Sequence, residues 1–525
     1  MANPAPGVSI NVSASTSNNK TNASTGTWFV LGTAQGPAGV AVPINSMADF
    51  NKYFGQTVNG QITGRYTVTP GSVTIDSTLL YDSLDVFFRE GGINAYVSRV
   101  VSSTAVTAKS PTASGKFLLT AQGAGTWANS ASGSTNGLIL TLTSFTVNST
   151  VVATATITYN GQTLAVSPTL GNDTDVINWV NSLPAYQSMC VASAQSGTTI
   201  FPSTTAQTVN VYLTGGTDVA TADADSVAAL AVFTDVYGPG QISFPGSTSG
   251  TVYANLTNHA ATFNRVAILD GANTATASTL ISAVTTLQAA VTDPSYAGIF
   301  APWLTIPGIG ATSASQTSGF VFSRTVPPSG FVAAQCATND TQNDANVPAA
   351  GINNGNLVYA TNVTQTWPAT STTGNDRQTL NNAGVNVIRL VPNTGTICIY
   401  GFRSTAVDPN WVYLNNVRFR MQVIKDLDIV AEGFVFNEID GKGHIFAKLN
   451  GAIAGVCQGY WTRGSIYGDT PTNAFSVNTG TQINTPTTIA AGQINAAVNL
   501  RMSPFGEYVT VNVTKYSVAS ALPTF

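Results

Sequence analysis

The sequence is poor in charge. Only 8% of its 525 residues are Asp, Glu, Lys or Arg, and the formal net charge is −4. Charged residues make up about a quarter of an ordinary soluble protein, so uncharged Ser, Thr, Asn and Gly supply most of the polar surface here. Because there is no basic excess, the composition predicts neither a nucleic-acid partner nor attraction to an anionic membrane.

Cysteine and histidine are scarce and scattered. The four cysteines are Cys190, Cys336, Cys398 and Cys457. Without a C-x-x-C pair they indicate buried free thiols rather than a zinc ribbon or a disulfide framework. The two histidines, His259 and His444, have no second His or Cys at ligand spacing. We therefore expect no metal and no cofactor.

Long apolar runs are also missing. No run reaches the length that spans a bilayer, and the opening "MANPAPGVS" lacks a basic segment followed by an apolar one. We expect a soluble chain made in the cytosol, with no direct membrane insertion.

Catalytic motifs are absent or incomplete. No G-x-x-x-x-G-K-[ST] occurs, and "GTAQGP" is not G-x-G-x-x-G, which argues against nucleotide and dinucleotide sites. "GVCQG" places Cys457 at the spacing of a hydrolase elbow, but an elbow follows a strand, and the preceding "HIFAKLNGAIA" has a helical pattern. The carboxylate pairs Asp223/Asp225 and Asp426/Asp428 fit solvated helix faces better than acid–base chemistry. We expect no enzyme.

What is present is enough apolar sequence, 43%, for substantial cores. In the first hundred residues strands and helices alternate, as in an α/β sandwich. We expect a strand at Trp28–Leu31, a helix between Ser46 as N-cap and Gly55 as its end, a second helix within 76–92, and a strand at Ala95–Val101.

The composition and the pattern of apolar residues change at about residue 106. From Phe117 to Asn172 there is no charged residue, only short Val/Ile/Leu/Thr-rich runs such as "GLILTLTSFTV" separated by Gly and Asn. This pattern predicts an all-β domain over 106–218. After it, helical patterns and the buried-looking strand "RVAILDG" return, so the α/β core is discontinuous in sequence.

Both ends of the chain carry strand signals. In "PGVSINVSAS" and "GEYVTVNVTKYSVAS", apolar and polar residues alternate. The apolar positions are Val8, Ile10 and Val12 at one end and Val509, Val511 and Val513 at the other. Because the polar run "TSNNKTNASTG" follows the first strand, we expect no pairing partner close to it in sequence.

Segments along the whole chain resemble contractile phage tail sheath proteins of the myovirus type. "FVLGTAQGPAGVAVPINSMADFNKYFG" and "LLYDSLDVFFREGGINAYVSRVV" resemble the opening of that family, and "LTAQGAGTWAN" and "LTGGTD" resemble the two borders of its insertion domain. "YAGIFAPWLTI", "VPPSGFVA", "LNNAGVNVIRLVPNTGTICIYGFRS" and "GSIYGDTPTNAFSVNTG" resemble its later segments, in order. The matches span about residues 27–500, although Phe331 stands where His is common and Tyr400 where Trp is common.

The resemblance implies a discontinuous α/β core with a mixed sheet and helices, an inserted all-β domain, and extended N- and C-terminal β arms. The implied segments are an N-terminal linking arm (1–25), a first core segment (26–105), an inserted outer domain (106–218), a second core segment that includes a C-terminal sheath domain (219–500), and a C-terminal linking arm (501–525).

The implied function is structural. Subunits of this family form stacked six-fold rings around a tail tube, and contraction drives the tube through the host cell envelope. Implied partners are further copies of the chain, the tail tube protein, and baseplate and tail terminator proteins; the implied location is the virion tail, assembled in the host cytoplasm. The terminal strands would add to sheets of neighbouring subunits.

Residues 389–463 hold 8 of the 20 Lys and Arg and 6 of the 24 Asp and Glu, which is typical of a solvated face or of a complementary interface. The candidate charged lattice contacts are Arg403, Arg418, Arg420, Lys425, Asp426 and Asp428. Alternatives to a phage sheath are the sheath of a phage-tail-like bacteriocin or of an extracellular contractile injection system, a surface adhesin-like binding protein, and a hydrolase that uses Cys457.

Overall fold

The computed structural model describes residues 10–12, 15–17, 25–58, 60–111, 115–309, 323–507, 509 and 515. The chain forms two compact units, Met1–Ile445 and Phe446–Phe525. The division falls inside the predicted segment 219–500, so the end of that segment belongs to a separate unit. Among the described helices, none has both the length and the apolar character needed to cross a membrane.

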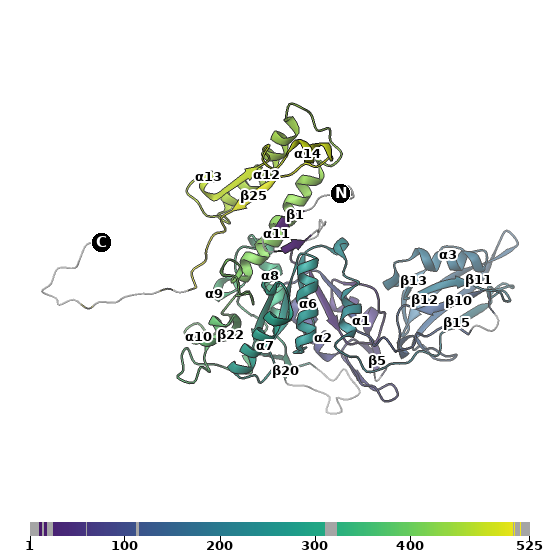
Figure 1. Ribbon diagram of the computed structural model, residues 1–525. Coiled ribbons are helices and arrows are strands. Elements are labelled where there is room, and N and C mark those ends of the chain that lie inside the picture. Colours follow the sequence, from purple (N-terminus) through teal and green to yellow (C-terminus); the bar gives the residue numbers. More distant parts are fainter. Residues whose placement is uncertain are drawn as a thin grey trace. The chain divides into compact units, whose positions relative to one another are not determined.

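An eight-stranded mixed sheet forms the centre of the first unit (Figure 1), in the order β23-β22-β18-β17-β16-β3-β9-β4. Its strands are β3 (Trp28–Gly32), β4 (Val42–Ile44), β9 (Ala95–Arg99), β16 (Gly240–Ser243), β17 (Arg265–Asp270), β18 (Ala297–Ala301), β22 (Val385–Val391) and β23 (Thr396–Ile399). The inner strands run parallel, and the edge strands β4 and β23 are antiparallel to their neighbours.

The sheet joins the two sides of the insertion. β3 lies between β9, which precedes residue 106, and β16, which follows residue 218. Trp28 is opposite Gln241 and Val30 is opposite Ser243 in the parallel register. The α/β core is therefore discontinuous in sequence, as predicted.

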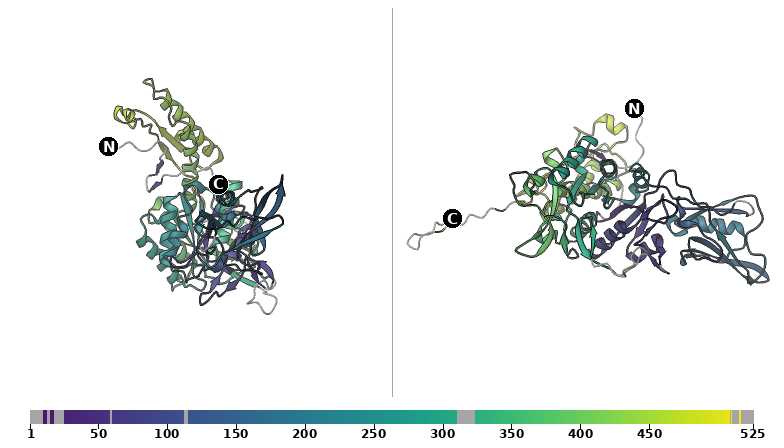
Figure 2. Two further views of the ribbon diagram at one scale, coloured as in Figure 1. Left: turned by 90° about the vertical axis from the view of Figure 1, so that its right-hand side faces the viewer. Right: turned by 90° about the horizontal axis from the view of Figure 1, so that it is seen from below.

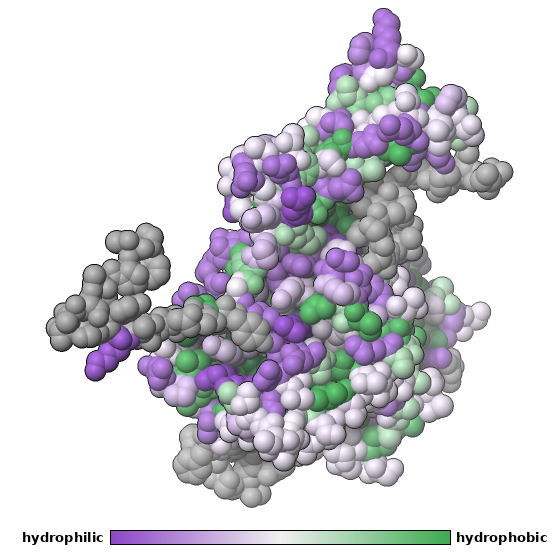
Figure 3. Space-filling view, turned by 60° about the vertical axis from the view of Figure 1, so that its left-hand side comes forward, coloured by the Kyte–Doolittle hydropathy of each residue, from purple (hydrophilic) through white to green (hydrophobic). Residues whose placement is uncertain are grey.

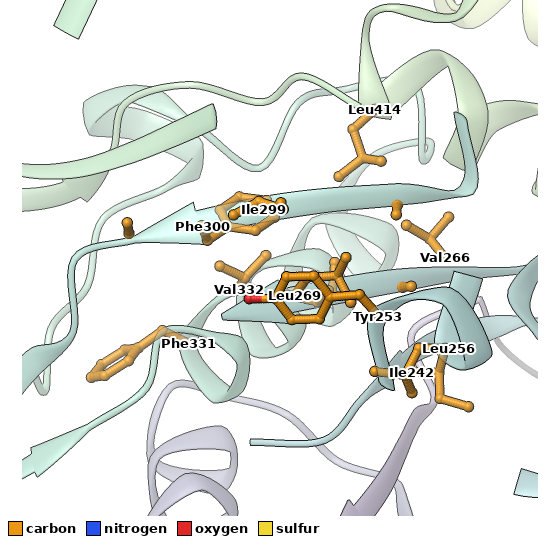
Figure 4. Close-up of a cluster of buried hydrophobic side chains, with 14 of the residues drawn as sticks. Ile242, Tyr253, Leu256, Val266, Leu269, Ile299, Phe300, Phe331, Val332 and Leu414 are labelled. Atoms are coloured by element: carbon orange, nitrogen blue, oxygen red, sulfur yellow. The ribbon is translucent and has the colours of Figure 1, made fainter. Parts of the chain in front are cut away.

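Helices cover both faces of this sheet (Figures 1 and 2), so its central strands are buried on both sides. On β3, Trp28 and Val30 enter one hydrophobic cluster, and Phe29 and Leu31 enter the other. Figure 4 shows part of the second cluster, where Tyr253 and Leu256 lie beside the strands that carry Ile242, Leu269 and Phe300.

The helices of the first unit outside the insertion are α1 (Met47–Phe54), α2 (Thr78–Arg89), α5 (Asp225–Leu230), α6 (Gly250–Thr262), α7 (Ala277–Ala290), α8 (Ser329–Gln342), α9 (Gly351–Asn354), α10 (Arg377–Asn382) and α11 (Leu414–Glu432). The Ser46 side chain accepts a hydrogen bond from the backbone N–H of Asp49, and Gly55 ends α1. The predicted boundaries of this helix are therefore confirmed.

Smaller sheets complete the core. Their strands are β5 (Gln56–Val58) with β6 (Gln61–Thr63), β7 (Thr67–Val68) with β8 (Ile75–Asp76), and β19 (Leu304–Pro307) between β20 (Ser323–Val326) and β21 (Asn362–Val363).

The inserted segment has its own layers. A four-stranded antiparallel sheet, β13-β12-β11-β15, lies beside the pair β10-β14. The strands are β10 (Phe117–Ala121), β11 (Leu138–Val147), β12 (Thr150–Tyr159), β13 (Gln162–Val166), β14 (Cys190–Ala194) and β15 (Thr208–Tyr212). Val106 and Thr217 form an antiparallel bridge, so the segments that enter and leave the insertion are neighbours.

The prediction that the insertion is all-β is wrong, because it also contains α3 (Asp173–Ser182) and α4 (Ala185–Ser188). The Asn172 side chain caps α3, and Val176 and Trp179 of this helix are buried in the same cluster as the sheet. The open inner face of a sheet needs such a cover, and the helix supplies it.

The second unit contains most of α12 (His444–Arg463) together with α13 (Pro471–Ala474), α14 (Pro486–Ala490) and a two-stranded sheet of β24 (Phe475–Asn478) and β25 (Ala497–Leu500). Asn450 of α12 donates to the carbonyl oxygen of Val477 at 3.1 Å, which ties the helix to the sheet.

Candidate assembly surfaces

The N-terminal strand signal forms a hairpin within the chain. β1 (Ile10–Val12) pairs antiparallel with β2 (Ser15–Ser17), with Ile10 opposite Ser17 and Val12 opposite Ser15. The expectation that this strand lacks a partner close in sequence is therefore wrong, because a backbone ladder needs no apolar side chain and the polar run itself supplies the second strand. A two-stranded hairpin is only marginally stable alone. Val8 lies outside the described residues.

The C-terminal strand signal is mostly outside the described residues, including Val511 and Val513. Val509 is described and is 87% exposed. A strand over 506–520 stays a prediction.

The two-stranded sheet of the second unit has open edges. β24 and β25 pair with each other, and among the described residues no third strand joins them. The Val477 carbonyl oxygen of β24 is already bound by Asn450 of α12. The remaining backbone N–H and C=O groups along the outer edges are a template for pairing with strands from another chain. Sequence patterns do not reveal this pair, because four-residue strands show too little alternation to be recognised.

Two of the arginines predicted at lattice contacts are buried. Arg418 is 0% exposed and Arg420 is 2% exposed. Their own subunit encloses both side chains in this conformation, and a lattice contact through either stays a prediction. Arg418 Nη2 donates to the two carboxylate oxygens of Asp340 at 2.8 and 2.7 Å. This charge-assisted pair connects α11 to α8.

Arg420 is held between two aromatic rings of its own subunit. Its guanidinium carbon lies 4.2 Å from the ring centroids of both Tyr296 and Trp411. Nη2 donates to Ser295 Oγ at 3.2 Å. Burial lowers the pKa of Arg420. A desolvated cation–π contact is worth about 2 kcal/mol, so Arg420 stabilises the packing of α11 inside the subunit.

The other four candidates differ in exposure. Asp428 is buried, at 6% exposed, so it is not presented to a neighbouring subunit in this conformation. Arg403 is half-buried, with its guanidinium 5.7 Å from the ring centroid of Tyr413. Lys425 Nζ lies 3.3 Å from Asp426 Oδ1, and their side chains are 21% and 27% exposed. A lattice contact through Arg403, Lys425 or Asp426 stays a prediction.

A buried charged cluster on α2 was missed by sequence reasoning. Arg324 of β20 donates from Nη1 to Asp82 at 2.7 Å and from Nη2 to Asp85 at 2.9 Å. Arg65 and Arg89 pair with the same two carboxylates, at 3.0 and 2.8 Å. The signal was present, because the two acids stand three residues apart inside the apolar run "LLYDSLDVFF" and so share the buried face of the helix.

A second ion pair lies at the base of the insertion. Arg99, at the end of β9, is 3.2 Å from Asp218, and both side chains are 2% exposed. Asp218 also accepts hydrogen bonds from Gln35 Nε2 at 3.0 Å and from the backbone N–H of Thr126 at 3.1 Å. One carboxylate therefore binds residues from the core and from the insertion.

The residues weighed for catalysis have structural surroundings. His259 is buried with Nε2 2.7 Å from Arg265 Nη1, and burial and that arginine lower the pKa of His259 to about 3. Burial raises the pKa of Cys457 to about 11; this residue lies within α12, which confirms the predicted helix. His444 is exposed and pairs with Asp440 at 3.3 Å. The described residues contain no group of three His, Cys, Asp or Glu that could hold a metal ion.

One face of the surface is drawn in Figure 3. Hydrophobic residues on it form small patches that hydrophilic residues separate. On this face, attachment to another subunit would rely more on backbone pairing and scattered contacts than on one broad apolar surface.

Comparison with known proteins finds similarity in structure alone. No family model and no curated protein matches the sequence. The fold matches a chain of the anti-feeding prophage baseplate, with a TM-score of 0.53, 15% identity and coverage of 98% of this chain and 100% of that one. It matches the sheath tail protein Lin1278 from Listeria innocua, with a TM-score of 0.55, 14% identity and coverage of 89% and 90%.

A third match is the PVC sheath complex of an extracellular contractile injection system in its contracted state, with a TM-score of 0.50, 15% identity and coverage of 98% of both chains. At such low identity these matches show the fold, and the chain has the fold of contractile sheath proteins.

Proposed function

We propose that the chain is the subunit of a contractile sheath, which polymerises with further copies of itself and shortens to drive an inner tube through a cell envelope. The observation that carries the proposal is the likeness over nearly the whole chain to sheath proteins, including 98% of its length for the PVC sheath. A fold shared over one domain would say little about function; here the core, the insertion and the second unit are all within the matched length.

Attachment between subunits would use backbone pairing. No third strand joins the sheet β24–β25 among the described residues, and the chain ends carry strand signals at Ile10, Val12 and Val509. An arm of one subunit would add a strand to this sheet in a neighbour, as in β-augmentation. Ladder bonds would give the attachment, and the alternating apolar positions would fix its register.

The core would move as a rigid body between two packings. Arg324 and Arg418 each join elements that are far apart in sequence, and both are fully or almost fully buried. Such a subunit can change neighbours without changing its fold, and small energy differences per subunit add up over many copies. The insertion would face outwards, away from the tube.

We extend the proposal to the arrangement of the subunits, their partners and the place of assembly. Subunits would form stacked six-fold rings around the tail tube protein, between the baseplate and the tail terminator, in a tail assembled in the host cytoplasm. Because the matches include a tail sheath protein and contractile injection systems, the sheath of a phage, of a phage-tail-like bacteriocin or of an injection system are all consistent with the fold.

Negative-stain electron microscopy of the purified chain tests the proposal. We expect hollow helical tubes from the intact chain and loss of tubes from a variant that lacks residues 1–20. A second variant, Ile10→Pro with Val12→Pro, removes two backbone donors but keeps the length, and should behave like the truncation. Lys116→Ala, at an exposed position outside the arms, is the control and should form tubes. Dispersed particles from the intact chain under all assembly conditions would refute the sheath proposal.

A further inference from the structure

The four-stranded sheet of the insertion has two contrasting faces. Leu138, Leu140 and Leu142 of β11 point into the core of the insertion and are at most 1% exposed. The alternate residues Thr141 and Thr143 point to the opposite side and are half-buried and exposed. We call this opposite side the threonine face.

The strand register places threonines in rows across this face. Thr143 of β11 lies between Thr154 of β12 and Thr208 of β15. In the next row, Thr141 lies between Thr156 and Asn210. Neighbouring strands are about 4.8 Å apart and alternate residues of one strand about 6.8 Å apart. The hydroxyl and methyl groups therefore form a regular two-dimensional array.

A third row and two aromatic residues extend the array. Thr158 is opposite Ile139 and Thr163, and Tyr212 is on the other side of Ile139. Phe145, six residues along β11 from Ile139, is 36% exposed. A six-residue separation on one strand corresponds to about 20 Å. An aromatic ring thus stands near each end of the face.

The hydroxyls of this face are available. Thr141 Oγ1 donates to Asn210 Oδ1 at 2.8 Å, whereas those of Thr143, Thr154, Thr156 and Thr158 have no partner within the described residues. Each hydroxyl can donate one hydrogen bond and accept two. No charged residue lies between Phe117 and Asn172, so β11, β12 and β13 place no charge on the face.

We propose that the threonine face binds a neutral polysaccharide. A sugar ring has hydroxyl groups at its edges and C–H groups on its faces, and threonine offers a hydroxyl and a methyl group to match them. The exposed ring of Phe145 and the half-buried ring of Tyr212 can lie against sugar faces. A charged polymer would find no counter-charge, and an apolar partner would leave the hydroxyls unpaired, at a penalty for each buried group.

The inference concerns a binding role that the sheath proposal does not include. It rests on the insertion's own sheet and requires only that the face is accessible. In an assembled sheath, an outward insertion would repeat the face in every subunit, so weak binding to a saccharide surface would gain strength from the number of copies.

The experiment is a pull-down of the full chain with insoluble cellulose, chitin and curdlan, and with the charged polymers alginate and heparin immobilised on beads. Sedimentation of the chain alone is subtracted. We expect binding to at least one neutral polysaccharide, unchanged between 0.1 M and 1 M NaCl because no ion pairs form, and no binding to the charged polymers.

The variant Thr143→Lys with Thr156→Lys places two charges at the centre of the face and should weaken binding at least tenfold. Thr174→Lys makes the same change on α3, whose buried residues belong to the opposite side of the sheet, and should bind normally. Thr143→Ser with Thr156→Ser keeps the hydroxyls and should retain binding. Circular dichroism checks folding, and Thr143→Lys alone replaces the double variant if that variant does not fold.

Three results would overturn the inference: no binding to any of the neutral polysaccharides, equal binding by the double lysine variant, or salt-sensitive binding to alginate or heparin. A lysine variant that changes only the self-association of the chain would assign the face to a second copy instead. Tube formation is scored separately, so loss of saccharide binding leaves the sheath proposal intact, and failure to form tubes leaves the saccharide inference intact.

Discussion

The core and the insertion use charge in opposite ways. The core buries ion pairs between segments far apart in sequence, such as Arg324 with Asp82 at a separation of 242 positions and Arg418 with Asp340. The insertion has no charged residue from Phe117 to Asn172, and its main sheet grows from the hairpin β11–β12.

The difference in the use of charge follows from how the helices and strands of each region come together during folding. A hairpin brings its strands together locally, and apolar alternation is enough to fix the register. Core elements must recognise distant segments, and a buried charge is tolerated only where a counter-charge, hydrogen-bond partners or an aromatic ring compensate for its lost hydration. We infer that the core uses its few charges for specificity, while the insertion is free to use uncharged side chains on both faces.

The largest effect is expected from breaking the charged cluster on α2. Arg324→Ala leaves the buried carboxylates of Asp82 and Asp85 short of a counter-charge, and loss of one partner of a buried pair costs roughly 3–5 kcal/mol. Urea unfolding of the subunit measures this change. The exposed Lys109→Ala in the insertion is the matched control and should stay within about 0.5 kcal/mol. Similar losses for both variants would contradict the contrast between the regions.

A smaller loss is expected at the border between the regions. Asp218→Ala leaves Arg99 buried without its carboxylate, although Arg99 keeps the carbonyl oxygens of Gly36 and Ala124 as acceptors. We expect a loss of about 2–3 kcal/mol. Limited proteolysis should show faster cleavage near residues 101–107 and 217–221 than in the intact chain, with Lys109→Ala as control. Unchanged cleavage would show that the ion pair does not hold the base of the insertion.

The core should also respond to pH through Asp270. Its carboxylate accepts hydrogen bonds from Ser329 N at 2.7 Å, Ser329 Oγ at 2.8 Å and Gly246 N at 2.9 Å. Burial nevertheless raises the pKa of Asp270 from 3.8 to about 7. The folded state therefore holds this proton more tightly than the unfolded state, so the stability that Asp270 contributes is complete below about pH 4 and is lost as pH rises through 7.

We expect the subunit to lose roughly 2–3 kcal/mol between pH 5 and pH 8 from this group. Asp270→Asn should reduce the pH dependence, whereas the exposed Asp469→Asn should keep it. Thermal unfolding at several pH values measures the difference. An Asp270→Asn variant with the same pH profile as the parent would exclude Asp270 as the cause.

The smallest effect is expected from removing the insertion. Val106 and Thr217 exchange backbone hydrogen bonds at 3.1 and 3.0 Å, so a short Gly-rich turn can replace residues 107–216. We expect tubes to form as before, because the strands β24 and β25 and the strand pairing of the core sheet are kept. Loss of all assembly would show that the insertion belongs to the lattice contacts. The intact chain, with the insertion in place, is the control.

Local patterns in the sequence were enough to predict the helices and strands that depend on short-range features. Ser46 and Gly55 set the ends of α1, and the burial of Trp28 through Leu31 follows from an uninterrupted apolar strand. The sequence predicts that the core continues after the insertion, but it does not predict that β3 pairs with β16. The register of that pair depends on contacts between segments that are far apart in the chain. α3 was missed because its polar positions, such as Asn178, hide the helical spacing of its buried residues.

The surface position expected for Arg418 and Arg420 differs from their burial in the structure for a physical reason. Charge in a chain with few charges suggests a surface role, but "VRFRM" places apolar residues on every side of α11 around Arg418 and Arg420. This first half of α11 is buried on every side, so its arginines find partners inside the subunit, with Asp340 and with the rings of Tyr296 and Trp411. The open pair β24–β25 and the threonine face needed the strand register, which composition does not contain.

The pairing of β3 with β16 also determines when the core sheet can be completed during synthesis of the chain. Trp28 donates its indole N–H to Ser243 at 2.9 Å, across 215 positions of the chain. A ribosome adds about 5–20 residues per second. The first buried strand therefore waits on the order of 10–40 s for its second neighbour, β16, although β9 emerges earlier. During that interval the insertion, whose strands are close together in sequence, can fold first. The nascent chain must meanwhile keep an apolar strand from pairing with other chains, which makes β3 the segment on which chaperones are most expected to act.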